Sequence, residues 1–318
     1  MDWYERHGYN SRVTCRVAQL ELARVDPRIY SVENDLGLPE VPFDKEFPDR
    51  YIQAGIAEAD LLGIAAGLSM RGKIPYVNTF ATFATMRACE QLRLDVAYPR
   101  HNVKVVGYYA GLSGGHAGPT HHCAEDIAVT RGIPNLTVVA PADAYEAYLA
   151  ILAAAEHDGP VYLRASRADT PAVYETVPPP DFRIGRAVRL RDGGDVTIVA
   201  SGCLVVPHAL DAAGLLAARG VECRVLNMHT LKPLDEEAIL DAARDTRLIA
   251  TYEDHNVIGG LGSAVASVVL SGAPAPVLRF GIPDEFCSRT GEYEEMVAAY
   301  GYGPATVAGA IMRHLERL

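Results

Sequence analysis

The sequence has little lysine and no closely spaced pair of cysteines. Lysine supplies four of the 29 basic residues, and the basic residues form no dense cluster. With a formal net charge of −11, we expect no nucleic-acid partner and no anionic membrane partner, because phosphate groups attract basic faces. The six cysteines form no C-x-x-C pair, which favours reduced thiols and predicts no metal site within this chain. They are Cys15, Cys89, Cys123, Cys203, Cys223 and Cys287.

Long apolar runs are also missing. No run reaches the length of a membrane span, and the first residues, MDWYERHGYNSR, lack the apolar core of a signal peptide. We therefore expect a cytoplasmic protein. Its 318 residues are ample for two domains, and 49% hydrophobic with 22% charged residues is typical of an ordinary globular chain.

Helical and strand-like segments alternate, which predicts an α/β fold of two domains, each with a mainly parallel sheet flanked by helices. A proline-rich stretch, ADTPAVYETVPPPDFRIG, indicates a linker at 169–184 between domains at 1–168 and 185–318. Strands are expected at 28–32, 74–78, 103–109, 137–140, 161–165, 196–201, 223–227, 248–252 and 277–280. Helices are expected at 11–24, from Glu58 onward, and at 82–96, 122–130, 142–156, 206–219, 235–243 and 262–270, followed by two short helices at the end of the chain. Ser11 is a candidate cap of the first helix.

The stretch from residue 47 to 93 contains one acidic residue in unusually apolar surroundings. Glu58 opens a helical segment whose next turns, 61–70, are small and apolar. Burying an unpaired carboxylate costs several kcal/mol at least, so this one needs a partner that carries a proton. Phe80 and Phe83 lie three apart at the expected start of the next helix, with their rings on one side. Together they suit a flat, protonatable heterocycle, although a helix cap and two core aromatic residues are the alternative interpretation.

Nearly the whole chain resembles the transketolase family. The runs AGIAEADLLGIAAGLSMRGKIPYVNTFATF, GLSGGHAGPTHH, PADAYEAYLAI and GPVYLRASR are similar to its pyrimidine-binding domain. The runs DVTIVASGCLV, RVLNMHTLKPLD, EDHNVIGGLGSAVA and FGIPDEFCSRTGEYEEMVAAYG resemble its C-terminal domain. The order and the spacing match, so the chain resembles the C-terminal subunit of a split, two-component transketolase.

The resemblance implies thiamine diphosphate as the cofactor, which does the chemistry while the protein supplies position and proton control. Glu58 matches the carboxylate that bonds the pyrimidine nitrogen, and Phe80 and Phe83 match the aromatic wall on which the pyrimidine stacks. A third family position, often tyrosine, falls near both Met86 and Arg87, and we include Arg87 among the cofactor-binding residues. His121 in GPTHH matches a histidine that assists proton transfers on the substrate, which suits imidazole near neutral pH.

Three further residues are expected to contact substrate. Arg167 matches an arginine that clamps a sugar phosphate, and Arg12 resembles a second one, since a guanidinium fork binds phosphate through two hydrogen bonds. Surface salt bridges are the alternative for both, and Arg164 is a local competitor that strand alternation would place on the opposite face. His116 stands in a loop that departs from the family.

That departure concerns the donor substrate. Many transketolases have Glu-Asp-Gly before the threonine and histidine, where this chain has His116, Ala117 and Gly118, and Tyr109 replaces a frequent histidine. Ala117 stands where those transketolases have the aspartate, which removes an acceptor for substrate hydroxyls, so the substrate is not expected to be a standard pentose phosphate. In the second domain, Glu253 and His255 of EDHN stay outside the predicted catalytic set, because the resemblance implies that this domain mainly builds the dimer. A tight turn at the glycines that follow is the alternative explanation of the motif.

The family holds the diphosphate through Mg²⁺ or Ca²⁺ at a Gly-Asp-Gly motif, which this sequence lacks. We therefore expect a separate N-terminal subunit that supplies metal and diphosphate binding, most simply in an α2β2 assembly. The expected reaction moves a two-carbon ketol unit from a ketose, expected to be a phosphate, to an aldose. Alternatives are activities like deoxyxylulose-phosphate synthase or the 2-oxo-acid dehydrogenase beta subunit, or a non-catalytic partner half.

Overall fold

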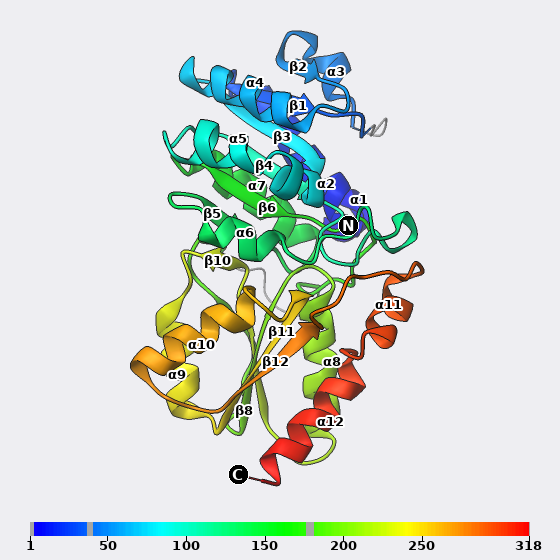
Figure 1. Ribbon diagram of the computed structural model, residues 1–318, viewed down its shortest axis with the longest axis vertical. Helices are drawn as coiled ribbons and strands as arrows, with labels where there is room; N and C mark the ends of the chain where they lie inside the picture. The colour runs from blue at the N-terminus through cyan, green and yellow to red at the C-terminus, as the bar shows by residue number, and fades with distance from the viewer. Residues whose placement is uncertain (1–2, 37–40, 176–180, 318) are drawn as a thin grey trace.

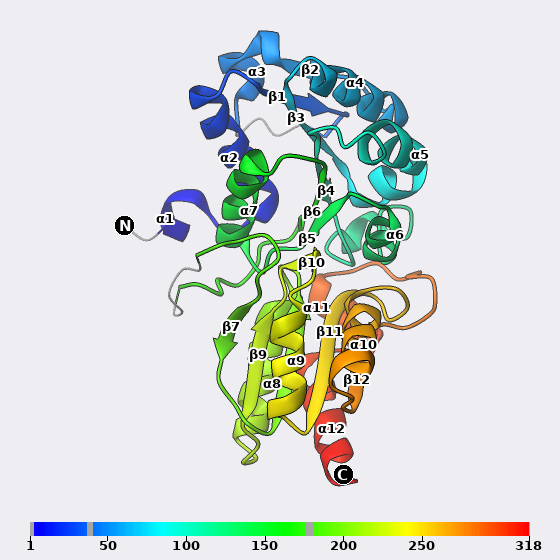
Figure 2. The same ribbon diagram turned by 90° about the vertical axis from the view of Figure 1, so that its left-hand side faces the viewer.

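The chain folds into two α/β units that lie one above the other in the computed structural model, which describes residues 3–36, 41–175 and 181–317 (Figure 1). One unit is built on a sheet of seven strands and the other on a sheet of five. Nearly all neighbouring strands are parallel, and helices cover both faces of each sheet (Figure 2). The predicted fold class is confirmed.

The first sheet has the strand order β10-β5-β6-β4-β3-β1-β2. Its strands are β1 Ile29–Glu33, β2 Tyr51–Gln53, β3 Ile74–Phe80, β4 Lys104–Tyr108, β5 Thr137–Val139, β6 Val161–Arg164 and β10 Thr230–Lys232. The central strands β4 and β6 are buried along their whole length, as expected of a parallel sheet covered on both sides. Strand β10 comes from the second half of the chain and runs antiparallel to β5, so the two units share a sheet edge.

The helices of the first unit divide between two apolar clusters. Helices α2 (Ser11–Val25) and α7 (Ala144–Glu156) pack together on one face of the sheet. Helix α4 (Glu58–Met70), the segment that follows β3, and α6 (Asp126–Gly132) pack on the other (Figure 2). This second cluster continues into the other unit, so the hydrophobic core crosses the boundary between them. Shorter helices are α1 (Trp3–His7), α3 (Phe43–Glu46) and η1 (Pro48–Arg50).

The second sheet has the order β12-β11-β8-β9-β7, with only the edge strand β7 antiparallel to its neighbour. Its strands are β7 Val188–Arg191, β8 Val196–Ser201, β9 Cys223–Asn227, β11 Leu248–Asn256 and β12 Val277–Ile282. Its helices are α8 Val205–Ala217, α9 Glu236–Asp245, α10 Leu261–Gly272, α11 Tyr293–Ala299 and α12 Pro304–Leu315. Helices α9 and α10 join the shared core, whereas α8, α11 and α12 pack on the other cluster. Among the described residues, no helix has the length and apolarity needed to cross a membrane.

Several local predictions were wrong. Asn10, and not Ser11, caps α2, because its side chain accepts hydrogen bonds from the N–H groups of Arg12 and Val13. The helix expected at 82–96 is interrupted: π-helical turns η2 (Phe83–Arg87) and η3 (Leu92–Ala97) flank a single α-helical turn, α5 (Cys89–Gln91). The short strands β2, β7 and β10 were not expected, since three or four residues carry little periodicity. Part of the predicted linker, 176–180, lies outside the described residues.

Candidate active site

Two of the predicted site residues, Phe80 and Arg167, lie at or just after the ends of strands of the first sheet, together with Asn34 and Tyr109, which were not among the predicted site residues. Asn34 follows β1, Phe80 ends β3, Tyr109 follows β4, and Arg167 comes three residues after β6. Parallel strands present their carboxyl ends along one edge, and that edge is where open α/β sheets bind ligands. The sheet therefore brings together residues that are up to 133 positions apart in the sequence.

Glu58 lies at the first position of α4, with 1% of its side chain exposed. Its Oε1 accepts a hydrogen bond from Asn34 Nδ2 at 3.0 Å, and its Oε2 accepts one from Arg87 Nη1 at 2.7 Å. Burial acts to raise the pKa of Glu58, but the hydrogen bonds from Arg87, from its own backbone N–H and from Asn34 hold that pKa below its ordinary value. The carboxylate is therefore buried, ionised and paired.

Three rings form a wall beside the carboxylate. Phe80 and Phe83 meet edge to face, with centroids 5.7 Å apart and an interplanar angle of 87°. The ring of His121 meets both, at 5.1 Å from Phe80 and 5.2 Å from Phe83. Phe80 is the last residue of β3 and does not begin a helix, so the expected helical spacing of the two phenylalanines was wrong although their rings do meet.

Arg87 connects the wall to the carboxylate. It ends the π-helical turn η2, and its guanidinium carbon lies 4.1 Å from the centroid of the Phe83 ring while Nη1 donates to Glu58. About half of the Arg87 side chain, 49%, remains exposed. A planar cation thus stacks on Phe83 and donates to Glu58 from the open side, and π-helical turns of this kind are frequent at functional sites.

The cationic residues gather around Tyr109. Arg167 Nε donates to the Tyr109 hydroxyl at 2.7 Å, and the Arg12 guanidinium carbon lies 6.0 Å from the centroid of the same ring. Arg12 also donates to the carbonyl of Leu36. Arg164, the competitor of Arg167, is buried and forms an ion pair with Asp126 at 2.8 Å, so it has a structural role.

His116 lies apart from these residues. It belongs to the 3₁₀ turn η4 (Gly115–Ala117), is exposed, and places Nε2 2.7 Å from a carboxylate oxygen of Glu292 in the second unit. Within the described ranges, its ring makes no hydrogen bond or ring contact with another predicted site residue. The geometry therefore groups Glu58, Arg87 and the aromatic wall, places Arg12 and Arg167 beside them, and leaves His116 on the loop that connects to the second unit.

The loop that carries His121 is held by a residue that the sequence analysis missed. Asp254 of β11 accepts hydrogen bonds from the N–H of Leu112, at 3.0 and 3.2 Å to its two oxygens. Gly111 has a φ of +60°, and a Cβ there would lie 1.9 Å from Asp254 Oδ2, so only glycine fits. Arg164 donates to the Asp254 carbonyl. The EDHN run was the available signal, but contacts over 142 residues cannot be read from spacing.

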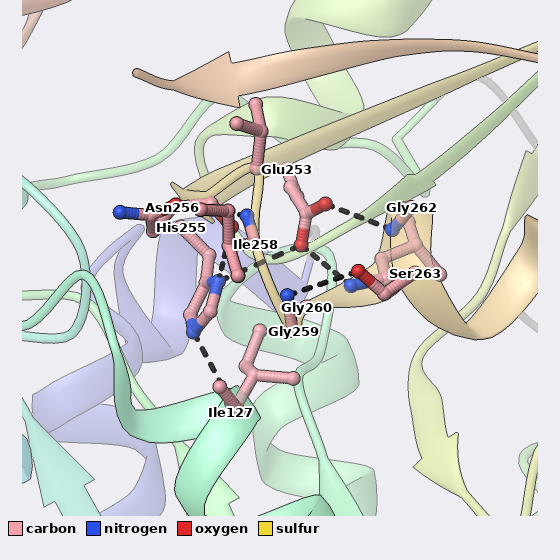
Figure 3. Close-up of polar contacts among 12 residues, drawn as sticks. Ile127, Glu253, His255, Asn256, Ile258, Gly259, Gly260, Gly262 and Ser263 are labelled. Atoms are coloured by element: carbon pink, nitrogen blue, oxygen red, sulfur yellow. Dashed lines mark hydrogen bonds and ion pairs between the residues drawn. The ribbon is translucent and has the colours of Figure 1, made fainter. Parts of the chain in front are cut away.

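Its neighbours Glu253 and His255 make structural contacts (Figure 3). Glu253 accepts from the N–H groups of Leu261 at 2.6 Å and Gly262 at 2.8 Å, which caps α10, and burial raises its pKa to about 7. His255 Nε2 accepts from the N–H of Ala128 at 3.2 Å, and burial lowers its pKa to about 4, so this imidazole is neutral. Glu253 thus connects β11 to α10 within the second unit, and His255 connects β11 to α6 of the first unit.

No group of three or more His, Cys, Asp or Glu residues in the described part of the chain has an arrangement that would hold a metal ion. All six cysteines are free thiols. The site therefore offers a buried carboxylate, two phenylalanine rings, an imidazole and the guanidinium groups of Arg87, Arg12 and Arg167. These side chains can bind a flat heterocycle and an anion and can move protons.

Two family descriptions match the chain: the pyrimidine-binding domain of transketolase over residues 9–172 and the C-terminal domain of transketolase over residues 185–307. A protein of Methanocaldococcus jannaschii named as a transketolase C-terminal section is 44% identical over 98% of this chain and 96% of its own length. One of the subunits of the apulose-4-phosphate transketolase of Phocaeicola vulgatus is 41% identical over 92% of this chain and 94% of its own. A solved structure of a split-gene transketolase, an inactive β4 tetramer, is 40% identical with a TM-score of 0.85, covering 96% of this chain and 97% of that one.

Proposed function

The chain belongs to the transketolase family, whose pyrimidine-binding and C-terminal domains it spans, and from this we propose that it is the C-terminal subunit of a two-component, thiamine-diphosphate-dependent transketolase. The reaction moves a two-carbon ketol unit from a ketose phosphate to an aldose. The observation that carries the proposal is the buried, ionised Glu58 beside the wall of Phe80 and Phe83.

The residues present fit the pyrimidine end of thiamine diphosphate. Glu58 offers a carboxylate oxygen, Phe80 and Phe83 offer ring faces and edges, and Arg87 borders both. Asn34 Oδ1 is buried next to Glu58 and has no partner among the described residues, so an acceptor is available for a further donor. When bound, the cofactor supplies a carbon nucleophile for the substrate carbonyl.

The chain's own residues then control protons and position. Glu58 would accept a hydrogen bond from a ring nitrogen of the cofactor's pyrimidine and would hold a proton there. His121, half-buried against both phenylalanine rings, exchanges a proton with a substrate hydroxyl while the wall excludes water from that side. Arg167 and Arg12 bind the anionic end of the substrate.

A second subunit supplies the rest of the site in this proposal. The sequence has no Gly-Asp-Gly motif, and Mg²⁺ or Ca²⁺ with the diphosphate would be held by that N-terminal partner in an α2β2 assembly. Support comes from a relative that is itself one subunit of a transketolase, and from a similar chain that is inactive as a β4 tetramer. A cytoplasmic location is supported by the six free thiols.

The test is reconstitution. The chain is purified and mixed with a candidate N-terminal chain that carries the metal and diphosphate motif, and ketol transfer is measured over a panel of ketose and aldose phosphates. We expect transfer by the mixture and none by either chain alone. Turnover by this chain alone would refute the two-subunit proposal, and decarboxylation of pyruvate in place of ketol transfer would favour the synthase or dehydrogenase alternatives.

A further inference from the structure

A cavity lies at the opposite end of the first sheet from Glu58 and the aromatic wall. We propose that it binds a small phosphate ester that also carries hydroxyl groups, at a site separate from the active site. The cavity measures about 320 Å³, at the lower end of the range for small-molecule sites. Its charged and polar lining residues include Arg28, Lys73, Arg100, His101, Asn102 and Asp158. The inference goes beyond the proposed function and does not depend on it.

The cavity lies where the amino ends of neighbouring strands meet. Arg28 precedes β1, Lys73 precedes β3, and Asn102 stands two residues before β4. These strands are neighbours in the sheet, so the loops that precede them are neighbours too. Strand β3 runs from Ile74 to Phe80, and at about 3.3 Å per residue it separates the cavity from the aromatic wall by about 20 Å. A ligand in this cavity therefore does not contact the wall or Glu58.

The loops around the cavity are tied to one another. Ser69, near the end of α4, accepts a hydrogen bond through Oγ from the N–H of Asn102 at 2.8 Å. Lys104, the first residue of β4, is 1% exposed, and its Nζ donates at 2.7 Å to each of the carbonyls on either side of Asp158. The buried ammonium thus holds the loop that carries this carboxylate. The lining residues are therefore presented by loops that hydrogen bonds hold in place.

The cationic side chains of the cavity are available to an anion. Arg100 and His101 form no side-chain hydrogen bond or ion pair within the described ranges. Lys73 Nζ lies 5.6 Å from the ring centroid of Tyr30 and likewise forms no ion pair there, so its N–H donors remain for a ligand. In a chain with a net charge of −11, two cations and an imidazole beside one cavity form a local site for negative charge.

The same cavity also offers acceptors. Asp158 is exposed and forms no ion pair with a described residue, and Arg28 is already paired with Asp26 at 2.7 Å. Asn102 Oδ1 is buried and has no hydrogen-bond partner in the described part of the chain, so nothing holds the amide, and it can turn to offer either end to a ligand. A carboxylate repels a bare anion but accepts a hydrogen bond from a hydroxyl. The mixed lining therefore favours a phosphate ester with hydroxyl groups over inorganic phosphate.

The experiment measures binding of sorbitol 6-phosphate, inorganic phosphate and sorbitol to the full chain by calorimetry. Every chain carries Arg167→Ala, which weakens phosphate binding in the active site. We expect sorbitol 6-phosphate to bind about tenfold more tightly than inorganic phosphate, and sorbitol not to bind. Arg100→Asn removes a charge, and asparagine tolerates the φ of +60° at this position, so it should raise the Kd for sorbitol 6-phosphate about tenfold without straining the loop. Arg71→Asn, at an exposed arginine outside the lining, is the matched control and should leave that Kd unchanged.

A second variant tests the acceptor. Asn102→Leu keeps the approximate size of the side chain and removes both polar ends, so sorbitol 6-phosphate should lose most of its advantage over inorganic phosphate. Because Oδ1 has no partner to lose, the free energy of unfolding should not fall. Absence of sorbitol 6-phosphate binding, equal losses in Arg100→Asn and Arg71→Asn, or an advantage over inorganic phosphate that persists in Asn102→Leu would overturn the inference. Each of these results leaves the two-subunit transketolase proposal intact, because reconstitution tests that proposal separately.

Discussion

Replacing Arg87 by methionine should destabilise the folded chain in a way that depends on the charge of Glu58. The substitution keeps an unbranched apolar side chain to lie over the Phe83 ring. It removes the hydrogen bond of 2.7 Å from Nη1 to Glu58 and the cation that lies 4.1 Å from the ring centroid. Because Glu58 is 1% exposed, water cannot easily replace the lost donor.

The magnitude follows from the two environments. A hydrogen bond to a charged group contributes about 1.5–3 kcal/mol when desolvated, and an exposed ion pair about 0.2–1 kcal/mol. Arg87 is 49% exposed and its partner is buried, so we expect a loss of about 1–2 kcal/mol in the free energy of unfolding near neutral pH. The pKa of Glu58 should rise in the variant, because burial raises that pKa and the hydrogen bond from Arg87 that lowers it is gone.

The sign of the pH dependence is fixed by the lowered pKa of Glu58. A carboxyl group whose pKa falls on folding adds stability above its ordinary pKa of 4.5 and loses that contribution as the pH falls through the folded value. The difference in the free energy of unfolding between the wild type and Arg87→Met should therefore be largest at about pH 7.5 and smaller at about pH 4.

The assay is urea unfolding of the free chain at both pH values. Arg93→Met is the matched control, because Arg93 is exposed and forms no ion pair in the part of the chain that the structure describes. Arg87→Lys should recover part of the loss by restoring the charge. An equal destabilisation at both pH values, or one matched by Arg93→Met, would refute the pairing argument.

Two further predictions concern the core. Burial raises the pKa of Glu146 to about 7 from an ordinary value of 4.5, so the free energy of unfolding should fall as the pH rises from about 4.5 through about 7. Glu146→Gln should remove this part of the fall, about 3 kcal/mol, when unfolding is measured across the same pH range. An unchanged pH profile would contradict the burial argument. Gly111→Ala should cost about 2–4 kcal/mol of stability, because its Cβ would collide with Asp254 at a φ of +60°. Gly67→Ala, in the open on α4, should instead add about 0.5–1 kcal/mol, and equal effects of the two substitutions would refute the contact.

The sequence predicted the features that local pattern determines. Buried parallel strands appear as continuous apolar runs, and β8 and β9 begin and end where expected. Helix α4 begins at Glu58 as expected, with two acids, Glu58 and Asp60, in its first turn and mostly small or apolar residues after them. Strand alternation was expected to place Arg164 and Arg167 on opposite faces, but β6 ends at Arg164, so alternation does not apply; Arg164 is buried in an ion pair, whereas Arg167 donates to Tyr109 from the loop that follows.

Features that depend on tertiary contacts were not predicted. The π-helical turn that contains Phe83 and Arg87 lies in the apolar cluster shared with α4, and helix propensity gives no sign of it. The addition of β10 to the first sheet joins segments 91 residues apart at Thr230 and Val139. The roles of Asp254 and Tyr109 likewise require knowing which loop lies against which side chain.

The most direct test of the central claim is the turnover of the reconstituted complex when Glu58 becomes glutamine. Glu58→Gln keeps the size and polarity of the side chain and removes its charge, so assembly should persist while kcat for ketol transfer falls about 10²–10⁴-fold. Glu90→Gln, which alters an exposed glutamate on α5, should leave kcat unchanged. A complex that contains Glu58→Gln and turns over at the wild-type rate would show that this carboxylate does not act on the cofactor.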